Sequence, residues 1–139
     1  MKTQRARRAA LFLYCCAIFA LSSRHGYPEI ERHFPLWMPD PGIFAHFIIF
    51  LGLGLVAWNT FKHEQAAWLN RRAAMAAFVF TALYGVTDEI HQLFVPGRNM
   101  QARDFVMNTL AAAAAAYYSS RRAVRVSAPE SEKPSSVAE

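Results

Sequence analysis

Charged residues are scarce in this chain of 139 residues, because Asp, Glu, Lys and Arg together make up only 18% of it. Hydrophobic residues make up 54%, which is more than the usual share in a soluble domain. The helices of a soluble bundle need a polar face toward water, and a few charges gathered in short clusters do not supply one. The composition and length therefore predict one domain of an integral membrane protein.

Cysteine is also nearly absent. The only two cysteines, Cys15 and Cys16, are adjacent and lie within an apolar run. Adjacent cysteines rarely bridge each other and the chain offers no other partner, so the sequence excludes a disulfide framework. We expect both to be packing residues.

The chain lacks the patterns of several other protein classes. Its net charge of +5 is not arranged as a basic stripe with interleaved aromatic residues, so we expect no nucleic-acid partner. It has no glycine-rich phosphate loop, and we expect no cofactor. The lysines and arginines are instead interpreted as signals of membrane topology.

Four apolar segments predict four helices. They are Ala9–Ser23, Ile43–Phe61, Ala73–Thr87 with a continuation to about Val95, and Asp104–Tyr118. A spanning helix needs about 20 predominantly apolar residues, so three of these segments require polar ends near the interface. The predicted fold is an all-α integral membrane protein with about four transmembrane helices packed as a bundle. The alanine run at the end of the fourth segment predicts a smooth packing face.

Basic residues are unevenly distributed among the predicted loops. Most of the 15 lysines and arginines lie at the N-terminus, between the second and third segments, or in the tail. Because cytoplasmic loops carry this excess, we predict that both termini are cytoplasmic. The expected organisation is a basic N-terminus (1–8), a helical membrane domain (9–120) and a cytoplasmic, disordered tail (121–139).

The first apolar segment has a second interpretation. Arg7 and Arg8, a short apolar run and the small residues Ala20–Ser22 are also typical of a secretory signal and its cleavage site. Cleavage would leave three spans and a cytoplasmic C-terminus, so the charge distribution fits both interpretations.

Many of the polar side chains gather around one predicted turn at Pro96-Gly97. If the third segment continues as a helix, Asp88, His91 and Gln92 share one face through i+3 and i+4 spacing. Glu89 then points about 100° away from Asp88. Ionisable residues at the edge of a span usually face the bundle interior and tend to be functional.

The second and fourth segments add residues at the same predicted level, which faces outward. Asp104 and Asn108 are spaced i, i+4, His46 lies near the outer start of the second segment, and Arg98 is the cation expected to pair with a carboxylate. We therefore predict an outward-facing polar cluster. Its members are His46, Asp88, Glu89, His91, Gln92, Arg98, Asp104 and Asn108.

These residue types allow more than one role. Glu89 and His91 form a candidate acid–base pair and would be the catalytic residues if the protein is an enzyme. Arg98 and Asn108 could equally tie helix ends together. Histidine and carboxylates also bind metals, but their spacing differs from His-Glu-x-x-His, and the sequence assigns no metal.

The stretch YGVTDEIHQLFVPGRNMQARDFVMNTLAAAAAA, residues 84–116, resembles the VanZ-like family of small bacterial membrane proteins. That family combines an Asp-Glu-x-x-Gln stretch, a Pro-Gly-Arg turn and an Asp-x-x-x-Asn start to the last helix, and all three occur here. His46-Phe47 matches an upstream histidine of the family. Gly42 and Ile43 depart from it, standing where the family commonly has an Asp-Lys pair.

The resemblance implies a multi-span helical protein of the bacterial inner (plasma) membrane. The family's namesake activity is low-level resistance to teicoplanin, a glycopeptide antibiotic that acts on cell-wall precursors outside the membrane. We expect this chain to lie in the lipid bilayer and to bind a cell-envelope or lipid-linked component through the polar cluster. The alternative is a membrane-embedded enzyme that uses acid–base chemistry on a lipid-linked envelope substrate. A small transporter fits least, because no broken-helix pair or inverted repeat is visible.

Overall fold

The computed structural model describes residues 2–24, 41–98 and 100–127. Every regular element in these ranges is a helix, which confirms the all-helical prediction for them. The elements are α1 (Lys2–Ser22), α3 (Pro41–Phe61), α4 (Ala67–Arg71), α5 (Ala73–Gln92) and α6 (Ala102–Ser127). The loop of residues 25–40 and the last part of the predicted disordered tail, 128–139, lie outside the described residues.

Two helices extend well beyond the apolar segments that predicted them, because α1 begins at Lys2 rather than Ala9 and α6 ends at Ser127 rather than Tyr118. Helix α5 ends at Gln92, in agreement with the predicted continuation past Thr87, and α6 runs well beyond Tyr118 to Ser127. Hydropathy reports the length of an apolar stretch rather than the end of a helix. The residues of α6 that follow Tyr118 include arginines and an alanine, which favour helix, and they include no glycine or proline.

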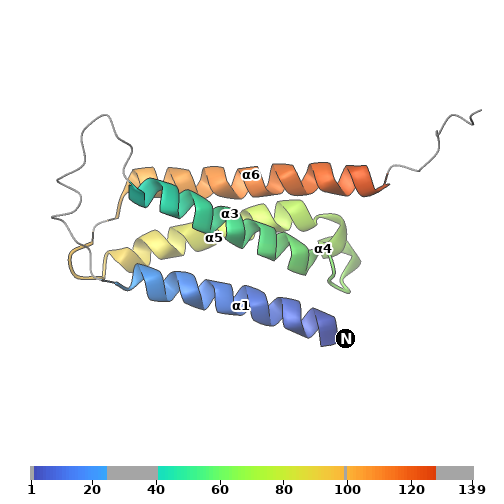
Figure 1. Cartoon of the computed structure of the whole chain (residues 1–139), viewed down its shortest axis with the longest axis horizontal. Helices are drawn as coiled ribbons and strands as arrows, with labels where there is room; N and C mark the ends of the chain where they lie inside the picture. Colours follow the sequence, from blue (N-terminus) through green and yellow to red (C-terminus); the bar gives the residue numbers. More distant parts are fainter. Residues whose placement is uncertain (1, 25–40, 99, 128–139) are drawn as a thin grey trace, which may run out of the picture.

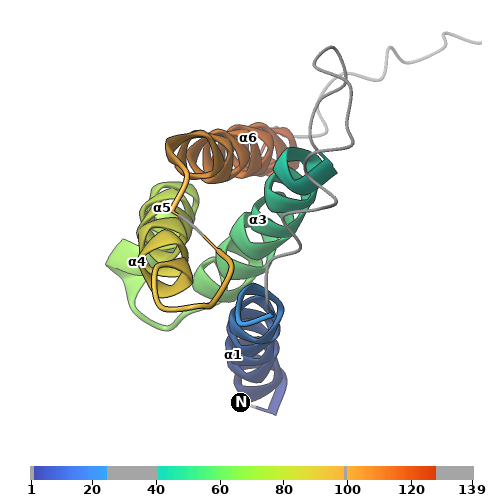
Figure 2. The same cartoon turned by 90° about the vertical axis from the view of Figure 1, so that its left-hand side faces the viewer.

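The four long helices alternate in direction along the bundle, with α3 and α5 between α1 and α6 (Figures 1 and 2). Helix α3 packs most extensively on α6 and α5, whereas α1 contacts mainly α3. The N-terminal end of α1 and the C-terminal end of α6 lie at the same end of the bundle (Figure 1), here called the terminal end. The turn between α5 and α6 lies at the opposite end, here called the turn end.

Close contact between α3 and α6 depends on small residues. A Cβ atom built on Gly54 of α3 would lie 2.6 Å from the Cβ of Ala115 on α6. Ala111, Ala112 and Ala115 are fully buried. The predicted packing face of the alanine run is therefore confirmed, and small side chains are what let two such helices approach each other.

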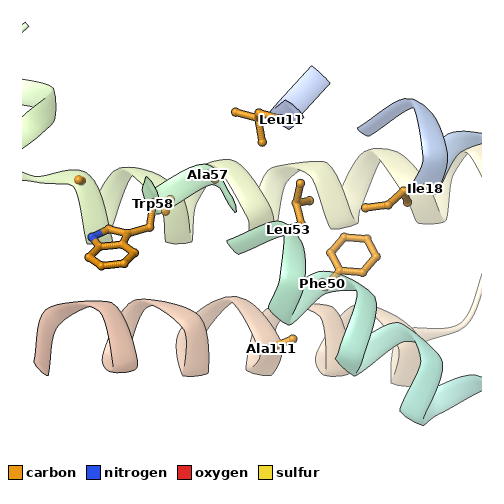
Figure 3. Packing of buried hydrophobic residues seen from close by; sticks show 9 residues of the cluster. Leu11, Ile18, Phe50, Leu53, Ala57, Trp58 and Ala111 are labelled. Atoms are coloured by element: carbon orange, nitrogen blue, oxygen red, sulfur yellow. The ribbon is translucent and has the colours of Figure 1, made fainter. Parts of the chain in front are cut away.

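The apolar core lies where α1, α3, α5 and α6 meet, and Figure 3 shows Leu53 and Phe50 of α3 between Ile18 of α1 and Ala111 of α6. Two tyrosines attach α1 to this core. Tyr84 Oη donates to the carbonyl of Cys15 (2.7 Å) and Tyr14 Oη donates to that of Ile49 (3.1 Å).

The two cysteines have different surroundings. Cys15 is half-buried against the core, whereas Cys16 is exposed on the surface of α1. The expectation that both are packing residues is therefore correct for Cys15 and wrong for Cys16, because consecutive helical residues point about 100° apart.

Large apolar side chains face outward from the bundle, while several polar ones lie inside it. Phe12, Ile48 and Leu83 are each more than 60% exposed, whereas Thr81 and Asn108 are completely buried. This is the reverse of the usual distribution in a soluble domain.

By length and composition, two helices within the described residues could cross a membrane, over Gly42–Phe61 and Ala73–Gln92. The apolar stretches of these two helices are mostly not buried within the fold. Helices α1 and α6 do not meet the same criterion, so four membrane spans remain a prediction.

Candidate functional site

A tight turn connects α5 to α6 at the turn end. Arg98 donates its backbone N–H to the carbonyl of Val95 (3.1 Å), and Gly97 has a φ of 76°. Proline at the second position and a positive φ at the third are typical of a type II turn, which requires glycine there. The predicted Pro96-Gly97 turn is confirmed, and it places the start of α6 beside the end of α5.

Three helices bring His46, Glu89 and Asp104 together at this end. His46 comes from the first turns of α3, Glu89 from the last turn of α5 and Asp104 from the first turn of α6. Each of the three residues offers one nitrogen or oxygen atom that could bind a metal, and these three atoms lie within 4.8 Å of one another. His46 is half-buried, Asp104 is 7% exposed and Glu89 only 1% exposed.

Asn108 orients the imidazole of His46. Its Oδ1 lies 3.1 Å from His46 Nδ1, and an amide oxygen only accepts hydrogen bonds, so Nδ1 is the donor. In the neutral ring, the lone pair is then on Nε2, which lies 4.0 Å from Asp104 Oδ2. The ring of Phe50 stacks on the imidazole, with its centroid 6.1 Å away.

The carboxylate of Glu89 is only partly satisfied by the protein. Its Oε2 accepts the backbone N–H of Gln101 (3.3 Å), but its buried Oε1 has no hydrogen-bond partner among the described residues. The Nδ2 of Asn108 is likewise buried and unpaired. A buried polar atom without a partner costs about 1–3 kcal/mol. The site therefore offers an acceptor and a donor to a molecule that enters it.

Asp88 and Gln92 form a separate pair on α5. Gln92 Nε2 donates to Asp88 Oδ2 (3.2 Å), and both side chains are buried. The shared face that i, i+4 spacing predicts for them is confirmed.

The sequence predicts Arg98 as the cation that pairs with a carboxylate of the cluster. Among the described residues the structure records no ion pair between Arg98 and Asp88, Glu89 or Asp104. The arginine recorded beside Asp104 is its neighbour Arg103, whose Nε lies 3.8 Å from Asp104 Oδ1.

His91 faces α1 rather than the other cluster residues. Its Nε2 lies 3.0 Å from Ser23 Oγ, and its ring centroid is 4.3 Å from that of Phe19. The structure therefore does not bring Glu89 and His91 together as an acid–base pair, because residues two positions apart in a helix point away from each other. The histidine beside Glu89 is His46.

Sequence reasoning missed several contacts of the site. The backbone N–H of Gln101 and the ring of Phe50 carry no polar motif, and Ser23 lies far from His91 in the sequence. The i, i+4 spacing of His46 and Phe50 on one helix face could have identified the stacked ring.

We call His46, Glu89, Asp104 and Asn108 the inner cluster. A family model described as VanZ/LLP1 matches residues 9–121, which include all of the inner cluster. No curated protein and no solved structure matches the chain. The chain belongs to the VanZ/LLP1 family, and the resemblance given by its motifs is confirmed.

Proposed function

We propose that this member of the VanZ/LLP1 family is a multi-pass protein of the bacterial inner membrane, and that its inner cluster binds a polar group of a cell-envelope or lipid-linked component. One observation carries the proposal. Glu89, Asp104 and Asn108 are buried at the turn end of the bundle, and among the described residues Glu89 Oε1 and Asn108 Nδ2 have no hydrogen-bond partner.

The distribution of side chains supports the membrane location. Apolar side chains cover the outside of the bundle and polar ones lie within it, and intramembrane polar residues normally face the interior of a bundle in this way. Helices α3 and α5 are long and apolar enough to span. We propose that α1 and α6, which have at least the same length and pack beside them, complete four spans.

The position of the basic residues supports an orientation. Arg8, Arg72 and Arg121 lie toward the terminal end, as do most other lysines and arginines of the described residues. The positive-inside rule then assigns the terminal end to the cytoplasm. Both termini are cytoplasmic in this proposal, and the turn end faces the cell envelope.

The inner cluster defines the chemistry of the proposed ligand. Glu89 Oε1 accepts a hydrogen bond from a hydroxyl or amine, and Asn108 Nδ2 donates one to an oxygen. Arg98, in the adjoining turn, supplies a cation for a phosphate. A lipid-linked sugar phosphate carries all of these groups.

The experiment that tests this proposal uses purified protein in nanodiscs and a short-chain polyprenyl phosphate sugar as the probe, with bound probe counted by native mass spectrometry. Glu89→Gln keeps the size of the side chain but removes its charge, and we expect it to weaken binding at least tenfold. Glu64→Gln is the matched control at the terminal end and should bind like the wild type. Equal binding by all three proteins would refute the proposal.

The family's association with teicoplanin resistance supports a role against that antibiotic. An outward cluster faces the compartment in which teicoplanin meets cell-wall precursors. We propose that expression of this chain raises the inhibitory concentration of teicoplanin in a susceptible Gram-positive host and that Glu89→Gln abolishes the increase. An unchanged inhibitory concentration for the wild-type chain at verified expression would exclude this role while leaving ligand binding to be judged by the nanodisc experiment.

A second candidate function is catalysis on a lipid-linked envelope substrate, favoured by the position of Glu89 beside His46. A carboxylate and an imidazole at one buried site can exchange a proton with a bound substrate. Catalysis predicts that Glu89→Gln abolishes turnover while the probe still binds, whereas a purely binding function predicts that binding itself is lost.

A further inference from the structure

We propose that His46, Glu89 and Asp104 together bind one divalent transition-metal ion of the Zn²⁺ or Mn²⁺ class. The three residues come from three different helices, yet one ligand atom of each lies within 4.8 Å of the others. The inference concerns the same part of the molecule as the proposed function but does not depend on it, because an ion can occupy the site without any envelope component.

The orientation of His46 is the one that a metal ligand requires. Asn108 Oδ1 accepts from Nδ1, so the lone pair of the neutral ring is on Nε2, on the side of Asp104. Metal-binding histidines characteristically use their second ring nitrogen to donate to an oxygen in this way, which fixes both the tautomer and the ring orientation.

The arrangement lacks a hydrogen bond where a metal would fit. His46 Nε2 and Asp104 Oδ2 lie 4.0 Å apart, which is too far for a hydrogen bond, and in this tautomer both are acceptors. Metal–ligand bonds of 2.0–2.2 Å at tetrahedral or octahedral angles separate neighbouring ligand atoms by roughly 2.8–3.6 Å. A small side-chain movement is therefore enough to bring both onto one ion.

The unpartnered oxygen of Glu89 is a second, independent observation. Glu89 is 1% exposed, and its Oε1 has no hydrogen-bond partner although its Oε2 accepts from Gln101. Carboxylates as buried as Glu89 and Asp104 are normally paired with a cation or bound to a metal. Arg103 Nε lies 3.8 Å from Asp104 Oδ1, and a divalent ion bound among the three residues would compensate the charge of Glu89.

The ligand set decides the class of ion. One imidazole nitrogen and two carboxylates suit Zn²⁺ or Mn²⁺, whereas Mg²⁺ prefers oxygen ligands and retains most of its water. Three protein ligands also leave at least one coordination position open, which is the arrangement of catalytic rather than structural zinc sites.

The test measures metal binding alone, on the full chain purified in detergent through a histidine-free tag and treated with a chelator. Isothermal titration with ZnCl₂ and with MnCl₂ should give about one ion per chain for at least one of the two. Removing the hydrogen-bond partner of a metal ligand commonly weakens metal binding 10- to 100-fold. We therefore expect at least a 100-fold loss for His46→Ala and Glu89→Gln, and a 10- to 100-fold loss for Asn108→Ala.

Two substitutions at the terminal end are matched controls. His63→Ala and Glu64→Gln remove the same residue types from the opposite end of the bundle, and both should bind the ion like the wild type. Circular dichroism and gel filtration identify any variant that fails to fold, in which case Asp104→Asn takes its place. Wild-type protein that binds neither ion at millimolar concentration, or folded His46 and Glu89 variants that bind as tightly as the controls, would overturn the inference.

Cobalt provides a spectroscopic readout of the residues that bind the ion. Co²⁺ added to the chelator-treated protein should produce visible absorption bands that are lost in His46→Ala and retained in His63→Ala. Measuring binding of the polyprenyl phosphate sugar to the metal-free protein separates this inference from the proposed function. Unchanged probe binding with no metal binding refutes the metal site alone, and metal binding without probe binding refutes the proposed ligand alone.

Discussion

The two ends of the bundle each hold a glutamate beside a neighbouring helix, and they use it differently. At the terminal end, Glu64 accepts hydrogen bonds from Arg8 Nε (2.7 Å) and Gln4 Nε2 (2.7 Å), both from α1. At the turn end, Glu89 is more deeply buried, accepts one backbone N–H and has one oxygen without a partner.

This difference separates a structural tie from a candidate site. The hydrogen bond from Arg8 lowers the pKa of Glu64 to about 2, from an ordinary value of 4.5. The protein itself therefore supplies the partners of the Glu64 carboxylate, and the interaction holds α1 against the connection after α3. Among the described residues, the structure records no hydrogen-bond partner for Glu89 Oε1, and this is the observation on which the proposed site is based.

The largest expected difference between the ends is their accessibility in intact cells. With Cys15 and Cys16 replaced by serine, single cysteines at Met100 and Gln65 report the turn end and the terminal end. The proposed orientation predicts that a membrane-impermeant maleimide labels Met100→Cys and leaves Gln65→Cys unlabelled until the cells are opened. The opposite result would place the inner cluster in the cytoplasm and end the proposal of an envelope ligand.

Helices α3 and α6 run between the two ends and pack closely on each other. A larger side chain at their contact should therefore destabilise the whole bundle. Gly54→Ala puts a methyl group 2.6 Å from the Cβ of Ala115, and overpacking of this kind costs about 1–3 kcal/mol. Thermal unfolding in detergent measures the loss. Adding Ala115→Gly should restore most of the stability, and a double variant no more stable than Gly54→Ala would show that this contact is not the cause.

At the turn end, Asn108→Ala removes the hydrogen-bond partner of the His46 imidazole. It leaves the Nδ1–H of His46 buried without an acceptor, which costs about 1–3 kcal/mol. The neighbouring Thr109, whose hydroxyl donates to the carbonyl of Phe105 in its own helix, provides the control, and Thr109→Ala should cost less than about 0.5 kcal/mol. Similar losses in unfolding free energy for the two variants would contradict the role assigned to Asn108.

The smallest expected effect is the pH dependence of the stability that Glu64 contributes at the terminal end. The pKa of Glu64 is about 2 in the folded protein and near 4.5 when unfolded, so its contribution is fully present above about pH 4.5 and is lost as the pH falls toward 2. Because Arg8 is exposed, solvent screens the ion pair and its contribution to the unfolding free energy should be small. Unfolding measured across this pH range should show a smaller decrease for Glu64→Gln than for the wild type, and parallel curves would argue against the tie.

Much of this protein could be predicted from its sequence, because local pattern and composition determine those features. Apolar segments located the long helices, Pro96-Gly97 located the turn, and the motif from Asp88 to Asn108 indicated the family. The i, i+4 spacing of Asp88 and Gln92 was enough to predict that they share a helix face. Each of these features depends on residues close together in the chain or on a characteristic motif.

Only the tertiary structure decided which polar side chains meet. His46 and Asn108 are far apart in the sequence, and their contact depends on how α3 and α6 cross, which the close approach at Gly54 determines. The same packing directs Glu89 toward His46 and Asp104, while His91, two residues later, faces α1. Helical periodicity predicts that Glu89 and His91 point in different directions, but only the packed neighbours show what each of them faces.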